Sequence, residues 1–224
     1  MLFRSGCPHL DVDASAANEV LVELAGELDV PLDLHTDEHL DAERLSLGDL
    51  ARRVIDTGFE HRVAASHCVS LGVQPEGVQR ATADSVAAAG IGVVALPHTN
   101  LFLQGRESQT AMPRGLTAVR ALREAGVDVA AGSDNLQDPF NPIGRGDPLE
   151  AAGLMVLAAH LLPDDAFGSV TSVARSVLGV APAGPTVGAS ADLMVTPVSS
   201  VREAIASGAP RSVVVRRGVV VHRA

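Results

Sequence analysis

The fold is constrained most by a repeated alternation of helical and extended segments. Apolar residues recur at helical spacing over residues 18–28, 47–57, 77–89 and 116–125. A short apolar segment follows each of them, at 30–34, 62–66, 91–96 and 127–131. Strands that are apolar throughout have both faces buried, as in a parallel sheet covered by helices. The sequence therefore predicts an α/β protein.

Polar residues follow each of the predicted strands. They are HTDE at 35–38, SHC at 66–68, PHTN at 97–100 and GSDN at 132–135. The carboxyl ends of parallel strands meet at one edge, where a β/α barrel builds its site from several strands. An open doubly wound sheet also binds ligands at that edge, so this feature leaves both architectures open.

The composition changes after two further predicted helices, at 155–162 and 169–178. Residues 179–192 form a loop rich in Gly, Pro and Ala, and a strand at 193–196 follows it. The last apolar segment is typical of a hairpin closed around Arg217 and Gly218. This pattern favours a main domain over residues 1–182 and a small β segment over residues 183–224.

Charge and cysteine content exclude several classes of partner. The 17 basic and 27 acidic residues give a net charge of −10, so we expect no nucleic acid polymer as a partner. Cys7 and Cys68 form no CxxC pair and indicate neither a disulfide framework nor a thiolate zinc site. The cysteine content fits a reducing cytoplasm, which is the expected location. No apolar run reaches the roughly 18 to 20 residues that span a bilayer, so we expect no membrane partner.

Three side chains of types that can bind a metal ion follow predicted strands. Each of His35, His67 and Asp134, taken singly, is more often structural than functional. Together they would meet at one edge of the sheet, with Glu38 three positions after His35. Imidazole and carboxylate groups bind divalent metals, and a bound metal lowers the pKa of water to about 7. The pattern indicates metal-assisted hydrolysis in which Glu38 carries protons.

Longer strings resemble the cytosine deaminase branch of the amidohydrolase superfamily, a group of metal-dependent β/α-barrel hydrolases. The matching strings are GCPHLD (6–11), DLHTDE (33–38), ASHC (65–68), LPHTNLFLQGR (96–106), PRGLTAVRALREAGVDVAAGSDNLQDPFNPIG (113–144) and SADLMV (190–195). They cover most of the chain in the family's order. The resemblance implies a TIM-type barrel and the hydrolytic deamination of cytosine or a related amino-substituted N-heterocycle, with release of ammonia.

The resemblance also implies roles for individual residues. His35 and Asp134 correspond to ligands of a divalent metal ion, zinc or iron. Glu38 corresponds to the residue that moves protons between the attacking water and the ring nitrogen. His67 corresponds to a partner of the activated water. Glu38, His67 and Asp134 are therefore the expected catalytic residues.

Four further residues are expected to line the substrate pocket: Asn135, Phe140, His9 and His98. Phe140 is equally compatible with an ordinary core position. Asn135 stands where the family has a second acid, and an amide donates as well as accepts hydrogen bonds. Which substrate ring is preferred therefore stays undecided, and cytosine is the first expectation. Asn100 and Gln104 are expected to have structural roles in their loop.

The family's His-x-His pair, which ends the first barrel strand and supplies two metal ligands, does not occur in this sequence. By the resemblance, the chain corresponds to about strands four to eight of the barrel. We expect an incomplete barrel with an incomplete metal site, in a fragment of a longer product, half of a split enzyme or a decayed remnant. Because an open barrel exposes strand edges, we expect a homo-oligomer or a complementing N-terminal half.

Two other functions remain open at this point. The first is a non-catalytic remnant or subunit that pairs with another chain through its open barrel edge. The second is a hydrolase of the same superfamily that attacks a cyclic amide in place of an exocyclic amine.

Overall fold

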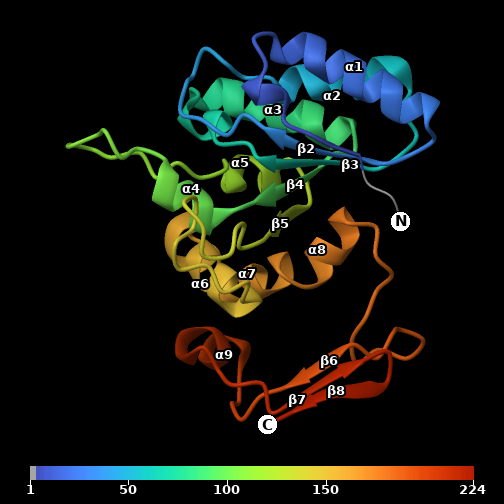
Figure 1. Ribbon diagram of the computed structural model, residues 1–224, viewed down its shortest axis with the longest axis vertical. Coiled ribbons are helices and arrows are strands. Elements are labelled where there is room, and N and C mark those ends of the chain that lie inside the picture. Colours follow the sequence, from blue (N-terminus) through green and yellow to red (C-terminus); the bar gives the residue numbers. More distant parts are fainter. Residues whose placement is uncertain (1–3) are drawn as a thin grey trace.

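The computed structural model describes residues 4–224, which form two β-sheets (Figure 1). The larger sheet has five parallel strands, and their spatial order follows their order in the chain. They are β1 (Arg4–Gly6), β2 (Leu32–Thr36), β3 (Val63–His67), β4 (Gly92–Ala95) and β5 (Val129–Ala131). The predicted α/β class with a parallel sheet is confirmed. The strand order contains no reversal of the kind that defines a doubly wound sheet.

The larger sheet is open at both sides. Within residues 4–224, β1 pairs only with β2, and β5 pairs only with β4. These residues therefore form no closed barrel. That the sheet is one part of a TIM-type barrel whose first strands are missing stays a prediction.

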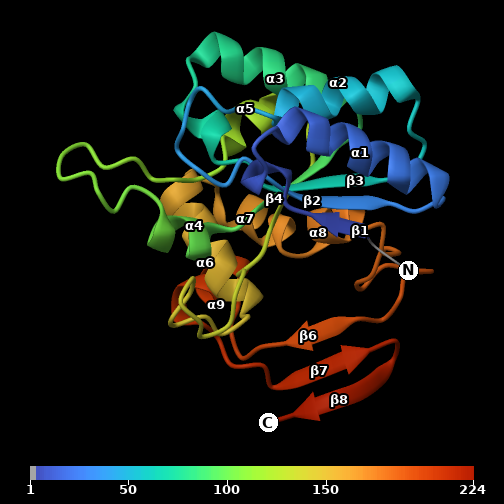
Figure 2. The same ribbon diagram turned by 45° about the horizontal axis from the view of Figure 1, so that its top comes forward.

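Helices connect the strands and cover the sheet. They are α1 (Ala14–Glu27), α2 (Leu47–Thr57), α3 (Glu76–Ala88), α4 (Pro97–Leu103), α5 (Val119–Glu124), α6 (Pro148–Ala159), α7 (Pro163–Ser169) and α8 (Ser172–Val177), with short 3₁₀ helices η1 (Pro8–Leu10) and η2 (Ser70–Val73). Figures 1 and 2 show α1, α2 and α3 side by side over one face of the sheet. None of the helices in the described part of the chain is long and apolar enough to cross a membrane.

The main core lies between this face of the sheet and the helices. Leu32 and Leu34 of β2 are buried in it. Because side chains alternate between the two faces of a strand, Asp33 and His35 lie on the opposite face. Strand alternation thus separates the apolar packing residues of β2 from its polar ones.

The opposite face is partly covered by α8. Val177 of α8 packs with Ala64 of β3 and Ala130 of β5 in a separate small cluster. A Cβ atom on Gly92 of β4 would lie 2.8 Å from a Val177 methyl carbon, so only glycine fits there. Small residues on this face allow a helix to approach the strands closely.

Most predicted elements are present, with shifted ends. Helix α6 begins at Pro148, seven residues before the predicted helix, because Asp147 caps it and Pro148 fits the first helical position. The prediction missed β1, which is three residues long and begins with Arg4. It also missed α4, which follows β4 directly through Pro97.

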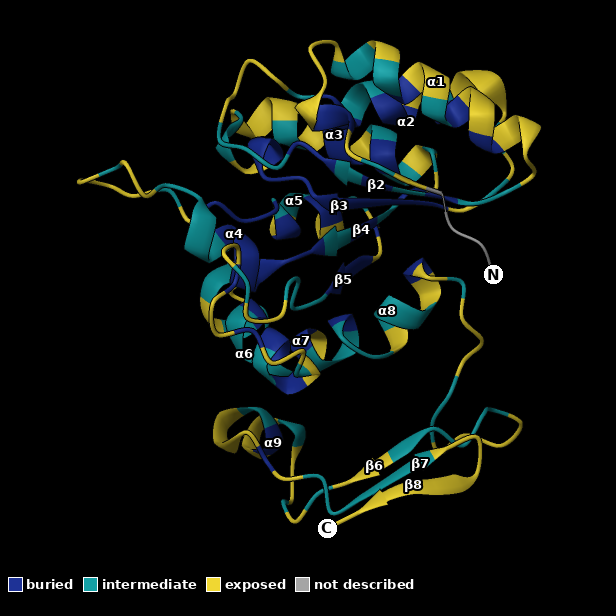
Figure 3. Cartoon of the chain, in the orientation of Figure 1, coloured by how far each residue is buried: buried dark blue, intermediate teal, exposed yellow. Residues whose placement is uncertain are grey.

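The C-terminal residues form the smaller sheet, which is antiparallel. It contains β6 (Leu193–Val195), β7 (Val213–Arg216) and β8 (Val219–Arg223), with an unpredicted helix α9 (Val201–Ser207) between β6 and β7. Arg217 and Gly218 both have positive φ, 50° and 79°, as a type I′ hairpin turn requires. The predicted hairpin is therefore confirmed, and Figure 3 shows that β8 is exposed along its length.

The C-terminal part packs on the rest of the chain through contacts of α9 with α6 and α7. Ala204 and Ala209 pack on Leu149 in a small apolar cluster. Beside it, Arg211 donates a hydrogen bond to the carboxylate of Asp147, which also accepts from the Leu149 N–H. The division into residues 1–182 and 183–224 stays a prediction, and these contacts would join the two parts.

We expect Asp147→Ala to lower the free energy of unfolding at pH 7 by about 1 to 2 kcal/mol, the usual range for a lost helix cap. Partial burial works to raise the pKa of Asp147, but hydrogen bonds from Arg211 and the Leu149 N–H outweigh it and hold that pKa below 3.8. A depressed pKa contributes stability above the unfolded value, and this contribution disappears as the pH falls through the folded value. Urea unfolding of both proteins at pH 7 and pH 3 measures the difference.

The matched control is Arg211→Ala, which removes the ion pair and leaves the cap. A stability difference between wild type and Asp147→Ala that does not shrink at pH 3 would contradict this account.

Candidate functional site

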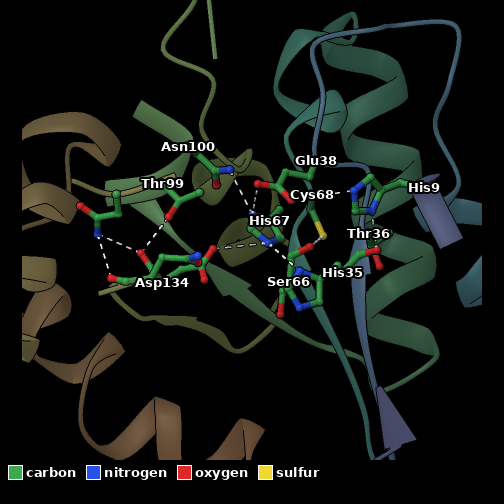
Figure 4. Close-up of polar contacts among 12 residues, drawn as sticks. His9, His35, Thr36, Glu38, Ser66, His67, Cys68, Thr99, Asn100 and Asp134 are labelled. Atoms are coloured by element: carbon green, nitrogen blue, oxygen red, sulfur yellow. Dashed lines mark hydrogen bonds and ion pairs between the residues drawn. The ribbon is translucent and has the colours of Figure 1, made fainter. Parts of the chain in front are cut away.

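Four polar side chains meet at the carboxyl ends of β2, β3 and β5 (Figure 4). His67 lies at the centre and its side chain is fully buried. Its Nε2 atom is 3.1 Å from Nδ1 of His35 and 3.8 Å from Oδ2 of Asp134. Its Nδ1 atom is 3.3 Å from Oε1 of Glu38. The structure therefore brings together His35, Glu38, His67 and Asp134, as expected from the sequence.

The backbone leaves each of these strands in a left-handed conformation. Positive φ angles occur at Asp37 after β2, at His67 and Cys68 at the end of β3, and at Asp134 and Asn135 after β5. Such angles in residues other than glycine cost roughly 1 kcal/mol or more each and concentrate at functional sites. The turns direct side chains at the edge of the sheet toward one point.

Asp37 holds the loop that carries Glu38. It is 1 % exposed, and its carboxylate accepts from the N–H groups of Ser46 (3.0 Å) and Leu47 (2.9 Å) at the start of α2. Its carbonyl accepts from the N–H of Val69, at 2.9 Å. The Gln104 amide donates to the Glu38 carbonyl at 3.3 Å. Glu38 is thus fixed by groups on three other segments.

Burial shifts the acid–base properties of the site in opposite directions. Burial, followed by the negative charge of Asp134, raises the pKa of Glu38 to about 7. Burial, followed by the neighbouring His35 and His9, lowers the pKa of His67 to about 3, against the hydrogen bond with Asn100. Burial also raises the pKa of Asp134, although His35 opposes the shift. At neutral pH, Glu38 therefore has both protonation states accessible while His67 is neutral.

Asn100 orients the ring of His67. It is fully buried in α4, and its Nδ2 atom lies 3.1 Å from Nδ1 of His67. This contact turns Nε2 of His67 toward His35 and Asp134. The sequence prediction assigned Asn100 only a structural role in its loop. Asn100 is the last residue of the polar string PHTN (97–100), which follows a predicted strand. That position is the signal that would have linked it to the site.

The donor set fits a divalent metal ion. Ligand atoms of His35, Glu38 and His67 lie within 4.8 Å of one another. The 3.1 Å between the His35 and His67 nitrogens is close to the roughly 3.3 Å expected for two nitrogens on one tetrahedral zinc ion. This group differs from the resemblance, which implies His35 and Asp134 as ligands. The two sets share His35, and Asp134 lies next to His67.

The four expected pocket residues have different neighbours in the structure. His9 lies beside the site, with Nδ1 2.8 Å from the His35 carbonyl and Nε2 3.8 Å from Oε2 of Glu38. His98 instead has Nε2 3.4 Å from Oε2 of Glu150 on α6. Asn135 donates to Asp138, and Phe140 is 52 % exposed on the same loop. Their roles in substrate binding stay predictions.

Comparison with known proteins identifies the family. The sequence model of the amidohydrolase family matches residues 2–222. The chain belongs to the amidohydrolase family. It is 38 % identical over 222 residues to the pterin deaminase of Rhizobium rhizogenes (strain K84 / ATCC BAA-868), covering 97 % of this chain and 51 % of the relative. The predicted relationship to deaminases of the amidohydrolase superfamily is confirmed.

Solved structures of amidohydrolase relatives superpose on nearly the whole chain. The 5-methylcytosine deaminase from Klebsiella pneumoniae liganded with 5-fluorocytosine matches with a TM-score of 0.90 and 26 % identity, over 99 % of this chain and 56 % of that one. The N-isopropylammelide isopropylaminohydrolase from Burkholderia multivorans ATCC 17616 matches with a TM-score of 0.83 and 30 % identity, over 98 % and 54 %. The chain thus spans about half the length of these relatives.

We expect Asp37→Ala to lower the free energy of unfolding by about 2 to 3 kcal/mol, because the buried N–H groups of Ser46 and Leu47 lose their acceptor. Guanidinium unfolding followed by circular dichroism measures this loss. The control is Asp41→Ala, since Asp41 is exposed and its carboxylate accepts from the exposed Glu43 N–H. Equal stability of the two variants would contradict the role of Asp37.

Proposed function

We propose that the site performs the hydrolytic deamination of an amino-substituted N-heterocycle, as part of a metal-dependent amidohydrolase. The observation that best supports this is the placement of Glu38, whose pKa is raised to about 7, 3.3 Å from the neutral imidazole of His67. A carboxyl group with a pKa near the working pH serves as both base and acid. Deamination needs both functions in one turnover.

In this mechanism the chain's own residues move protons. His35 with Asp134 or His67 would hold a divalent metal, which when bound would act as a Lewis acid and lower the pKa of water. Glu38 accepts one proton from the attacking water and delivers it to the ring nitrogen. A C–O bond forms at the ring carbon, and the C–N bond to the exocyclic amine breaks. The second water proton leaves with the amine as ammonia.

His67 and His9 would support the proton transfer. His67 is neutral at pH 7 because of its lowered pKa, so it can hydrogen-bond to the attacking water without carrying a competing charge. The Nε2 atom of His9 lies 3.8 Å from Oε2 of Glu38, whereas His67 lies next to the other carboxylate oxygen, Oε1. Glu38 is therefore held between two imidazoles.

The relatives support a substrate class more firmly than a single substrate. Two of them are named as deaminases of pterin and of 5-methylcytosine. We propose an amino-substituted ring of this kind, with pterin, 5-methylcytosine and cytosine as the first candidates. The side-chain amide of Asn135 donates to Asp138, which would leave its Oδ1 atom as an acceptor for a ring N–H group.

The chain, completed by a segment equivalent to the other half of its relatives and supplied with Zn²⁺ or Fe²⁺, should release ammonia from at least one ring of that panel and yield the corresponding oxo compound. Glu38→Gln should lower the rate by about 10²- to 10⁴-fold, the usual contribution of general acid–base catalysis, with the metal retained. Ammonia assays with chromatography of the product, and metal analysis of both proteins, test this. Ring-opened products would instead establish a cyclic-amide hydrolase, and unchanged turnover in Glu38→Gln would refute the role of that residue.

We further propose that a second polypeptide segment completes the sheet. The edges of β1 and β5 each have a strand on one side only within the described chain. Unpaired parallel edges present free backbone groups that pair readily with another strand. The chain spans about half of its relatives, so a segment equivalent to their other half fits both edges at once.

Co-expression with the uncovered half of the Rhizobium rhizogenes pterin deaminase should give a one-to-one complex. Size-exclusion chromatography with light scattering measures the mass, and zinc affinity should rise by at least about tenfold as further ligands are added. Val221→Lys, on the exposed strand β8 of the smaller sheet, is the control and should still form the complex. Self-association of the chain without capture of the added half would contradict the proposal.

A further inference from the structure

The two left-handed exits at β3 and β5 turn the carbonyl groups of His67 and Asp134 away from the hydrogen bonds of the sheet. His67 has φ +67° and Asp134 has φ +47°. A buried carbonyl needs a donor, and without one the peptide favours a conformation in which the carbonyl finds a partner. Because the side chain turns with the backbone, the donor to that carbonyl also decides where the side chain lies.

Two buried side chains donate to the Asp134 carbonyl. Thr99 Oγ1 lies 2.8 Å from it, and Asn141 Nδ2 lies 2.9 Å from it. The same Asn141 nitrogen is 3.2 Å from the carbonyl oxygen of Asn135, the next left-handed residue. Thr99 and Asn141 are each 2 % exposed, so both donor side chains are shielded from water. Figure 4 shows Thr99 reaching the backbone of Asp134 from the α4 side.

At the end of β3, one buried side chain donates to the carbonyl of His67. The hydroxyl of Thr117, which is 4 % exposed, donates to the carbonyl of His67. Thr117 lies 50 positions after His67 in the chain, in the segment that precedes α5. The two site residues with left-handed backbone thus share one arrangement, in which a buried threonine from a distant segment holds the carbonyl.

The loop after β5 has little freedom to adopt another conformation. A Cβ atom on Gly144 would collide with the Asn135 carbonyl oxygen and the Asn141 side chain, so the loop closes tightly on itself. Asp138 accepts from the N–H groups of Phe140 (2.9 Å) and Asn141 (3.0 Å), which places the Asn141 side chain beneath Asp134. The donors are therefore held in place before any ligand binds.

We propose that Thr99, Thr117 and Asn141 are positioning residues, which aim Asp134 and His67 into the site by holding their left-handed carbonyls. This inference rests on the proposed function, because it concerns the same site. In the described structure Thr117 and Asn141 make no polar contact with the four central side chains, whereas the Thr99 hydroxyl also hydrogen-bonds to the Asp134 carboxylate. Displacement of a site group by about 1 Å is enough to cost 10²-fold in rate.

The test compares Thr99→Val and Thr117→Val, which keep the side-chain shape and remove the donor. Each should weaken zinc binding by about tenfold, measured with Zn²⁺ alone against a chromophoric chelator, as expected for loss of an outer contact to a metal site. In the deamination assay each should lower kcat by at least about tenfold and leave KM within about twofold. Thr99→Ser and Thr117→Ser retain the hydroxyl and should restore both quantities.

The matched control is Thr82→Val. Thr82 is a buried threonine of α3, 8 % exposed, next to Gly48 of α2 and away from the site. It should leave zinc binding and kcat unchanged, whatever it does to thermal stability. Asn141→Ala, combined with Thr99→Val, should weaken zinc binding further than either change alone.

Three results would overturn the inference, and the failure of the proposed function is distinguishable from the other two. If the wild-type chain binds zinc and deaminates, but the valine variants match Thr82→Val in affinity and kcat, the positioning role is wrong and the proposed function stands. If the wild-type chain, alone and with the added half, neither binds zinc nor releases ammonia, the proposed function fails and this inference fails with it. A loss of thermal stability without loss of affinity would also reject positioning.

Discussion

The site depends on the parallel register between β2 and β3. In that register His35 lies opposite Ser66, and Thr36 lies opposite His67, so the two strands end level with each other. A slip of one residue would turn His35 to the face occupied by Leu34 and remove it from the site. The burial of Leu32 and Leu34 under the helices disfavours that slip, because it would expose both side chains. The packing of an apolar core thereby positions a polar site on the other face.

Burial then determines the chemistry that the site supports. The same exclusion of water that raises the pKa of Glu38 lowers the pKa of His67, because it disfavours the charged form of each. Near pH 7 the carboxyl group of Glu38 can gain and lose a proton, while the neighbouring imidazole of His67 stays neutral. This arrangement is effective for transferring protons. These shifts require both side chains to be enclosed, which the left-handed turns and the Asp37 loop bring about.

Much of the architecture could be predicted from the sequence. The helix at residues 47–57 was predicted with the bounds that α2 has, and the strands β2 to β5 were found within two residues at most of their ends, because their apolar patterns are strong. The missed elements lack such a pattern. Strand β1 is short and begins with a charged residue, and α9 lies in the small C-terminal part, whose apolar residues are largely exposed.

The sequence by itself determined which residues stand at the strand ends and hence the four members of the site, since the alternation of helices and strands already orders those ends along one edge. The tertiary structure decided where the neighbouring side chains point: His98 toward Glu150, Asn100 onto His67, and Phe140 into partial exposure. It also decided that Thr99 and Thr117 hold the turns at Asp134 and His67. Periodicity reports burial and local conformation, whereas these contacts join residues that are tens of positions apart and exist only after the strands have paired.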